Sequence, residues 1–169
     1  TDRDIVNRID DSVVRIDLGE PRLVRRARGY APAAIDLPPG LEGAPDIRAY
    51  GADLKNAFCI TKDGGAILSQ HMGDLDDPAT ADDLVRNLSL YQNLFEHDPE
   101  IIAVDQHPEY RSSKLGRELA KQLDRPLIEV QHHHAHIASC LAENAWPGDG
   151  GKVLGVALDG AGWGADATI

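Results

Sequence analysis

Short apolar runs that alternate with helical patterns constrain the fold of this chain more than any other feature. Residues 101–105 (IIAVD) and 126–130 (PLIEV) are apolar runs of strand length, and a helical pattern follows each of them. The first of these helices is expected to be capped by Ser112 or Ser113. Buried strands separated by helices are typical of a parallel sheet in an α/β domain. The sequence therefore predicts a strand-helix-strand-helix unit in this part of the chain.

An antiparallel unit is predicted before it. Residues 57–75 contain two apolar stretches joined by Asp63-Gly64-Gly65, a turn in which glycine supplies positive φ at little steric cost. A helix is predicted over about residues 81–96, with Thr80 as its N-cap and acidic residues in its first turn. A hairpin followed by alternating helices and strands predicts a mixed-sheet α/β domain.

The two ends of the chain are less regular. The alternation of residues 5–18 predicts two short strands around a turn at residues 10–12, and the Pro- and Gly-rich residues 31–45 predict a linker. Residues 152–169 predict a strand, a glycine turn and a second strand. Because the chain begins at Thr1 and stops inside a strand-like run, we expect a fragment of a longer protein.

Composition narrows the possible functions. The formal net charge of −11 argues against a surface that binds nucleic acid through phosphate contacts, although it allows a local basic patch. The apolar runs are too short to cross a bilayer and the first residues show no signal pattern, so we expect a cytoplasmic protein that does not bind membranes. The two cysteines, Cys59 and Cys140, are too few for a disulfide framework and are expected to be small buried hydrophobes.

Four histidines lie within five positions at the start of the last predicted helix. His132 and His136 are four residues apart, so a helix would present both imidazoles to a single ion, whereas His133 and His134 would point elsewhere. The alternative is that these histidines only cap and solvate the start of a helix. Their position directly after a strand favours a ligand site, because ligands of open α/β sheets bind at the carboxyl edge.

A second candidate site is the glycine-rich segment 159–166 (DGAGWGAD). Its glycines do not follow the Rossmann spacing, and a strand-like run follows where that motif needs a helix. An acid followed by a glycine turn can approach phosphates through backbone N–H groups while the carboxylate holds a metal, as in actin, sugar-kinase and Hsp70-type ATPases, which this segment resembles. An ordinary glycine-rich hairpin is the alternative. Asp159 could complete a His, His, Asp set, which suits Zn, Fe or Mn.

Seven segments together resemble one known family. They are, in chain order, DRDIVNRIDDSVVR, RRARGYAP, LKNAFCI, LSQHMGDL, AVDQHPEY, VQHHHAHIASCLAEN and ALDGAGWGADATI. In this order they resemble the hydrogenase maturation carbamoyltransferases of the HypF family. The resemblance implies that residues 1–30 are the C-terminal tail of a YrdC-like α/β domain and residues 31–45 a linker. It implies that residues 46–169 are the N-terminal half of a TsaD-like carbamoyl-transfer domain, a mixed-sheet half-domain of the actin-like ATPase, or ribonuclease H-like, class.

The resemblance also implies a function. In this family carbamoyl phosphate and ATP, with Mg, form carbamoyl-adenylate, and the carbamoyl group passes to the C-terminal cysteine of the partner HypE for cyanide ligand synthesis. The family's metal ligands match His132 and His136, and its acid before the phosphate turn matches Asp159. The resemblance also implies the turn glycines Gly160, Gly162 and Gly164 and the nucleotide-facing Ser12, Arg25 and Arg28 as site residues. Lys55 and Asn56, in the first hairpin of this domain, could face the same phosphate, and Asp159 and Lys55 are the candidate catalytic residues.

Alternatives remain for several of these assignments. Lys55 could be an ordinary surface lysine, and the arginines could be the solvated edge of a strand. The pattern does not decide whether His71 and His107 are structural or part of a site. At the level of function, the alternatives are a TsaD-type tRNA threonylcarbamoyl transferase and a non-catalytic metal-binding module. Because most of the family's domains have no counterpart here, the fragment alone is expected to be inactive.

Overall fold

The computed structural model describes residues 2–160, 162–164, 166 and 168. It contains eight strands and three helices among these residues: β1 (Val13–Asp17), β2 (Glu20–Arg25), β3 (Ile35–Asp36), β4 (Ile47–Ala49), β5 (Cys59–Lys62), β6 (Gly65–Leu68), α1 (Pro78–Leu94), β7 (Ile101–Asp105), α2 (Arg111–Leu123), β8 (Leu127–Val130) and α3 (His132–Glu143).

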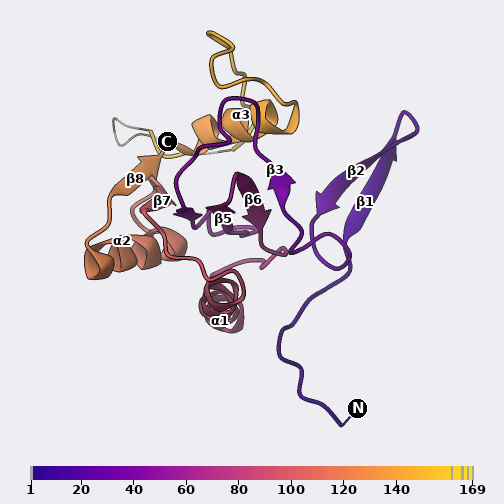
Figure 1. Ribbon diagram of the computed structural model, residues 1–169, viewed down its shortest axis with the longest axis vertical. Coiled ribbons are helices and arrows are strands. Elements are labelled where there is room, and N and C mark those ends of the chain that lie inside the picture. The colour runs from indigo at the N-terminus through magenta and orange to yellow at the C-terminus, as the bar shows by residue number, and fades with distance from the viewer. Residues whose placement is uncertain (1, 161, 165, 167, 169) are drawn as a thin grey trace.

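Six of the strands form one mixed sheet in the order β3-β6-β5-β4-β7-β8. The pairs β3–β6, β6–β5 and β5–β4 are antiparallel, and the pairs β4–β7 and β7–β8 are parallel. Helices α1 and α2 lie on one side of this sheet and α3 on the other (Figure 1). The prediction of a mixed-sheet α/β domain is therefore confirmed. The segment expected to be a linker contributes the short edge strand β3.

Strands β5 and β6 form the hairpin expected from the glycine turn. Asp63 and Gly64 have φ angles of 51° and 77°, the conformation of a two-residue turn whose twist matches that of the flanking strands. The core lies between this part of the sheet and α1, where Phe58 packs edge-on against Tyr91 at a centroid distance of 4.8 Å. Leu84 of α1 is completely buried in the same cluster.

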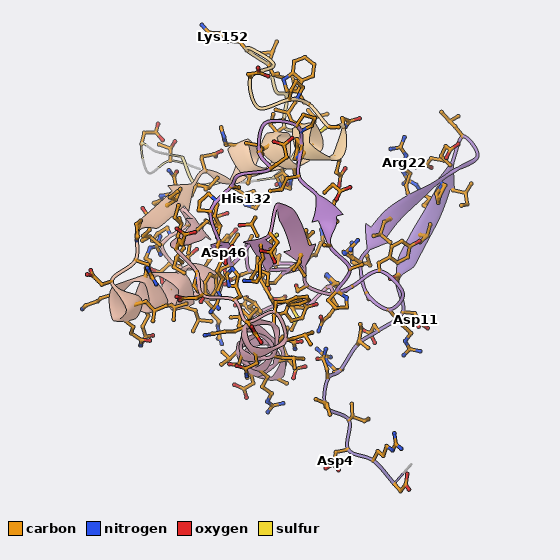
Figure 2. The ribbon with its side chains drawn as sticks, in the orientation of Figure 1. Asp4, Asp11, Arg22, Asp46, His132 and Lys152 are labelled. Atoms are coloured by element: carbon orange, nitrogen blue, oxygen red, sulfur yellow. The ribbon has the colours of Figure 1, made fainter. Side chains whose placement is uncertain are left out.

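The N-terminal hairpin differs from the prediction. Strands β1 and β2 are joined at Leu18 and Gly19, which have φ angles of 53° and 87°, and the predicted turn at residues 10–12 is wrong. A two-residue turn with both φ angles positive fits the twist of a hairpin. The turn therefore lies eight residues later in the chain than the acidic residues of the predicted turn suggested. This hairpin extends away from the main sheet, with Arg22 exposed on it (Figure 2).

Helix α1 begins before its predicted start. The N-cap is Asp77, whose carboxylate accepts hydrogen bonds from the Thr80 N–H at 2.9 Å and the Thr80 hydroxyl at 2.8 Å. Pro78 occupies the first turn, where its fixed φ favours a helix and its missing N–H has no cost. The prediction of Thr80 as N-cap and of acidic residues in the first turn is therefore wrong.

We expect this cap to make stability depend on pH. The two Thr80 hydrogen bonds lower the pKa of Asp77 below its ordinary value. Because the folded-state pKa is depressed, the carboxylate contributes its full stability above the unfolded pKa of about 4, and loses it as pH falls through the folded pKa. The urea midpoint should fall less between about pH 5 and pH 2 in Asp77→Asn, which keeps an acceptor without a charge. Equal falls in the two proteins would contradict this assignment.

Helix α2 is capped by a residue far away in sequence. Asp53, which follows β4, accepts hydrogen bonds from Arg111 N at 2.8 Å through Oδ2 and from Ser112 N at 3.0 Å through Oδ1. Its Oδ1 also accepts one from the Ser112 hydroxyl at 2.9 Å. Neither Ser112 nor Ser113 is the N-cap, as both lie inside the helix, so this prediction is wrong.

The C-terminal part differs most. Strand β8 exists as predicted but is an edge strand with exposed apolar side chains, including Leu127 and Ile128, so its predicted burial is wrong. Residues 153–158 form no strand, because no neighbouring segment among the described residues pairs with them. The second strand expected near the C-terminus falls largely outside the described residues. No helix in the described part of the chain is long and apolar enough to cross a membrane.

Candidate metal centre

The parallel pairing of β7 and β8 places two polar side chains at one edge of the sheet. Asp105 ends β7 and lies opposite Val130, the last residue of β8. Only Gln131 separates Val130 from His132, the first residue of α3, so His132 lies beside Asp105. Gln131 caps α3 through a hydrogen bond from His134 N to its Oε1 at 2.8 Å. The strand ends and this cap together fix the start of the histidine helix.

Three candidate ligand atoms converge at this edge. Asp159 Oδ2 lies 3.1 Å from His132 Nε2 and 2.9 Å from His136 Nε2, and the two imidazole nitrogens are 3.2 Å apart. The structure thus brings together the three predicted metal ligands, two from one face of α3 and one from the segment after it. His132 is the least exposed of the three, and the side chain of Asp159 is 43% exposed.

These distances suit a bound cation. Metal–ligand bonds of about 2.1 Å place neighbouring ligand atoms about 3.4 Å apart in a tetrahedral site and about 3.0 Å apart in an octahedral one. The three separations, of 2.9 to 3.2 Å, are close to both values. Two imidazoles and a carboxylate form a donor set that Zn²⁺ and Fe²⁺ both accept. The residues therefore fit a divalent metal.

Asp105 is a site residue that the sequence analysis missed. Its Oδ2 lies 2.7 Å from His132 Nδ1, on the side of the ring opposite the converging atoms, and its Oδ1 accepts a hydrogen bond from His107 N at 2.8 Å. Its side chain is only 7% exposed. The sequence does show an acid at the end of the apolar run 101–105. Its contact with His132 depends on the pairing of β7 with β8.

The described residues after Asp159 make local contacts. Gly160 N donates a hydrogen bond to Asp159 Oδ1 at 2.8 Å, and this bond, followed by the contact with His136, lowers the pKa of the Asp159 carboxyl. Gly162 lies directly against the His133 ring, because a Cβ atom there would come within 2.7 Å of His133 Cε1. Gly164 N donates to Thr168 O at 2.8 Å. Of the three predicted turn glycines, Gly162 is thus the one in contact with α3, whereas Gly160 bonds to Asp159 and Gly164 to Thr168.

The two undecided histidines differ in their surroundings. His107 stacks on Tyr110 with a centroid distance of 4.1 Å and meets the Trp163 ring edge-on at 5.5 Å, so it belongs to the edge that carries the cluster. Burial, followed by the negative charges of Asp105 and other carboxylates, raises the pKa of Tyr110. The His71 N–H donates to Arg26 O at 2.7 Å, which ties the segment after β2 to the segment after β6.

The remaining predicted residues lie elsewhere. Lys55 is exposed, and its ammonium makes no hydrogen bond within the described part of the chain. Asn56 is buried, and its Nδ2 donates to Tyr50 O and Ala52 O at 3.0 and 2.6 Å, so its N–H groups hold the preceding loop.

The N-terminal hairpin and the residues at its base contain the partners of three other predicted site residues, Ser12, Arg25 and Arg28. Ser12 Oγ donates to Arg28 O, and Arg28 forms an ion pair with Asp11. The Arg25 guanidinium donates to Val24 O. These contacts all lie within residues 11–28, so they organise the base of the N-terminal hairpin. The structure joins Ser12 to Arg28, but within the described part of the chain it shows no hydrogen bond from these three side chains to His132, His136 or Asp159.

The fold and site define a mixed-sheet α/β domain with a His, His, Asp cluster at the carboxyl edge of its parallel strands. Residues 42–143 match the family model described as the HypF Kae1-like domain. The chain belongs to the HypF carbamoyltransferase family.

Individual relatives agree with this assignment. The chain is 51% identical to carbamoyltransferase HypF of Rhodobacter capsulatus over 99% of its own length and 22% of the relative's. It is 44% identical to carbamoyltransferase HypF2 of Cupriavidus necator, over 98% of this chain and 20% of that protein. The chain thus spans about a fifth of the length of the curated relatives it matches.

Two solved structures share the fold. A crystal structure of full-length HypF in the phosphate- and nucleotide-bound form matches with a TM-score of 0.85 and 47% identity, over 99% of this chain and 25% of that one. HypF of T. kodakarensis matches with a TM-score of 0.82 and 36% identity, over 95% of this chain and 20% of that one. The agreement covers nearly the whole chain in both cases.

Proposed function

We propose that this chain provides the metal-centre part of a carbamoyltransferase that transfers a carbamoyl group to HypE. The observation that carries the proposal is the convergence of His132 Nε2, His136 Nε2 and Asp159 Oδ2 at the carboxyl edge of the sheet. Membership of the HypF family supports carbamoyl transfer as the reaction class. It also favours a protein thiol as the acceptor over the tRNA acceptor of a TsaD-type enzyme.

The proposed substrates are carbamoyl phosphate and ATP, joined as carbamoyl-adenylate. In the transfer step, the HypE cysteine thiolate attacks the carbamoyl carbon, a C–S bond forms, the C–O bond to the phosphate breaks, and AMP leaves. A divalent metal held by His132, His136 and Asp159 would supply charge neutralisation at the phosphate and polarise the acyl group. The glycine turn at 160–164 would approach the phosphate through backbone N–H groups. A related HypF structure holds phosphate and nucleotide, which supports this class of ligand.

A segment exchange tests the proposal. The matching segment of the Rhodobacter capsulatus relative would be replaced by this chain, and carbamoylation of HypE would be measured by mass spectrometry in the presence of ATP, Mg and carbamoyl phosphate. We expect transfer by the hybrid and its loss when His132 and His136 are both alanine. Transfer at the same rate with both alanines would overturn the proposed role of the cluster.

A second candidate is a metal that serves only stability, and metal removal distinguishes the two. We expect chelation by EDTA to leave the far-UV circular dichroism nearly unchanged, because α3 has no buried residue and adds nothing to the core around Leu84. If the ion were structural, its removal would unfold the domain. Loss of helical signal on chelation, restored by Zn²⁺, would favour the structural role.

A further inference from the structure

The buried carboxylate of Asp105 is not explained by the proposed ligand set. It lies beside His132 on the side of the ring away from His136 and Asp159, with its Oδ2 2.7 Å from His132 Nδ1. Its side chain is 7% exposed, compared with 43% for the Asp159 carboxylate that faces the opposite nitrogen. A buried carboxylate at this distance holds the ring in one orientation.

The hydrogen-bond chemistry also fixes the position of the ring proton. An ionised carboxylate can only accept hydrogen bonds, so Nδ1 of His132 must donate to Asp105. A neutral imidazole carries one proton, and Nε2 is then left with a free lone pair. That lone pair points toward Asp159 Oδ2 and His136 Nε2, at 3.1 and 3.2 Å.

The second oxygen of Asp105 also accepts a hydrogen bond, so an amide cannot replace this carboxylate without losing a bond. Oδ1 accepts the His107 N–H at 2.8 Å, so both oxygens are used as acceptors by the protein. An asparagine of the same shape can keep only one of these bonds. If its oxygen stays on the His107 N–H, its NH₂ group faces His132 Nδ1, which must then accept, and the ring proton moves to Nε2.

We propose that Asp105 is the positioning residue that holds His132 as the Nδ1–H tautomer and so presents the Nε2 lone pair to a divalent cation. This inference rests on the metal centre of the proposed function, because the orientation of the Nε2 lone pair matters only if a cation binds there. It assigns to Asp105 a role in metal affinity separate from its place at the end of β7. Partners of this kind around a metal-binding histidine typically change affinity by about 10- to 100-fold.

The first test reads the tautomer without any metal. Long-range ¹H–¹⁵N correlation spectra of the histidine rings would be recorded on the metal-free chain at about pH 9, where imidazole is ordinarily neutral. We expect His132 to be protonated at Nδ1 in the wild type and to shift toward Nε2–H in Asp105→Asn. Protonation of wild-type His132 at Nε2 would overturn the inference, even if the variant did not fold.

The second test measures Zn²⁺ affinity by competition titration. We expect Asp105→Asn to bind about 10- to 100-fold more weakly than the wild type. Asp53→Asn is the matched control, because it makes the same change in another buried carboxylate of this part of the fold, one that contacts α2 and not His132. It should lose stability while keeping the tautomer and the affinity.

The outcomes separate the two proposals. If the wild type binds neither Zn²⁺ nor Fe²⁺, the proposed metal centre is wrong. The proposed effect of Asp105 on metal affinity is then also wrong, even if His132 is protonated at Nδ1. If the wild type binds and Asp105→Asn binds equally well, only the role of Asp105 is overturned. Equal weakening in Asp105→Asn and Asp53→Asn would also overturn it, since a general loss of structure would then account for the effect.

Discussion

The double variant His132→Ala, His136→Ala should weaken Zn²⁺ binding by more than about 100-fold and leave the fold intact. Two of the three converging atoms are lost, and the remaining carboxylate of Asp159 is exposed to solvent, where a single ligand holds a cation poorly. The fold should persist because α3 buries none of its residues and alanine is the strongest helix former.

Isothermal titration of Zn²⁺ and Fe²⁺ into the metal-free chain would measure this loss, with circular dichroism of both proteins before and after. His134→Ala is the matched control: its side chain is exposed on the same helix and lies outside the cluster. Equal binding by the double variant and the wild type, or no binding by either, would remove the metal from the proposed function.

Asp53→Ala should destabilise the chain by about 2–4 kcal/mol, more than an ordinary N-cap. The substitution removes three hydrogen bonds at once, two from backbone N–H groups of α2 and one from the Ser112 hydroxyl. Ser112 is completely buried, so its backbone N–H would have no solvent to replace the carboxylate, whereas its hydroxyl can still donate to Gly51 O at 2.9 Å. Because the bonds join the segment after β4 to α2, their loss also loosens a contact between distant parts of the chain.

Urea unfolding followed by circular dichroism measures this effect. Asp82→Ala is the control, since it removes an exposed aspartate of α1 with no hydrogen-bond partner among the described residues. We expect a change within about 0.5 kcal/mol for that variant. A loss for Asp53→Ala no greater than for the control would show that α2 does not depend on its distant cap.

Elements with strong local signals could be predicted from the sequence. The turn at Asp63 and Gly64 depends on two adjacent residues that tolerate positive φ, and it formed where expected. The strand at 101–105 and the helix from His132 were also confirmed, because apolar length and helical period are properties of the segments themselves. The pairing of His132 with His136 required only the period of a helix.

Features that depend on distant contacts could not be predicted. The cap of α2 comes from Asp53, 58 residues before Arg111, so the nearer Ser112 and Ser113 misled the prediction. Residues 153–158 have the composition of a strand, but a strand needs a partner, and composition does not reveal whether one is present. Asp105 was missed for the same reason, because its role arises from the neighbour that β8 gives it.

The distant cap also has a consequence for the ligands that this edge of the sheet can accept. The first N–H groups of a helix, with the positive end of its dipole, ordinarily attract anions. At α2 those donors are already bonded to the carboxylate of Asp53, which adds a fixed negative charge at the same place. A phosphate group would therefore meet repulsion at α2, whereas the cap of α3 is the uncharged amide of Gln131. The two helix starts thus differ in their caps, with a carboxylate bonded to the first N–H groups of α2 and a neutral amide at α3.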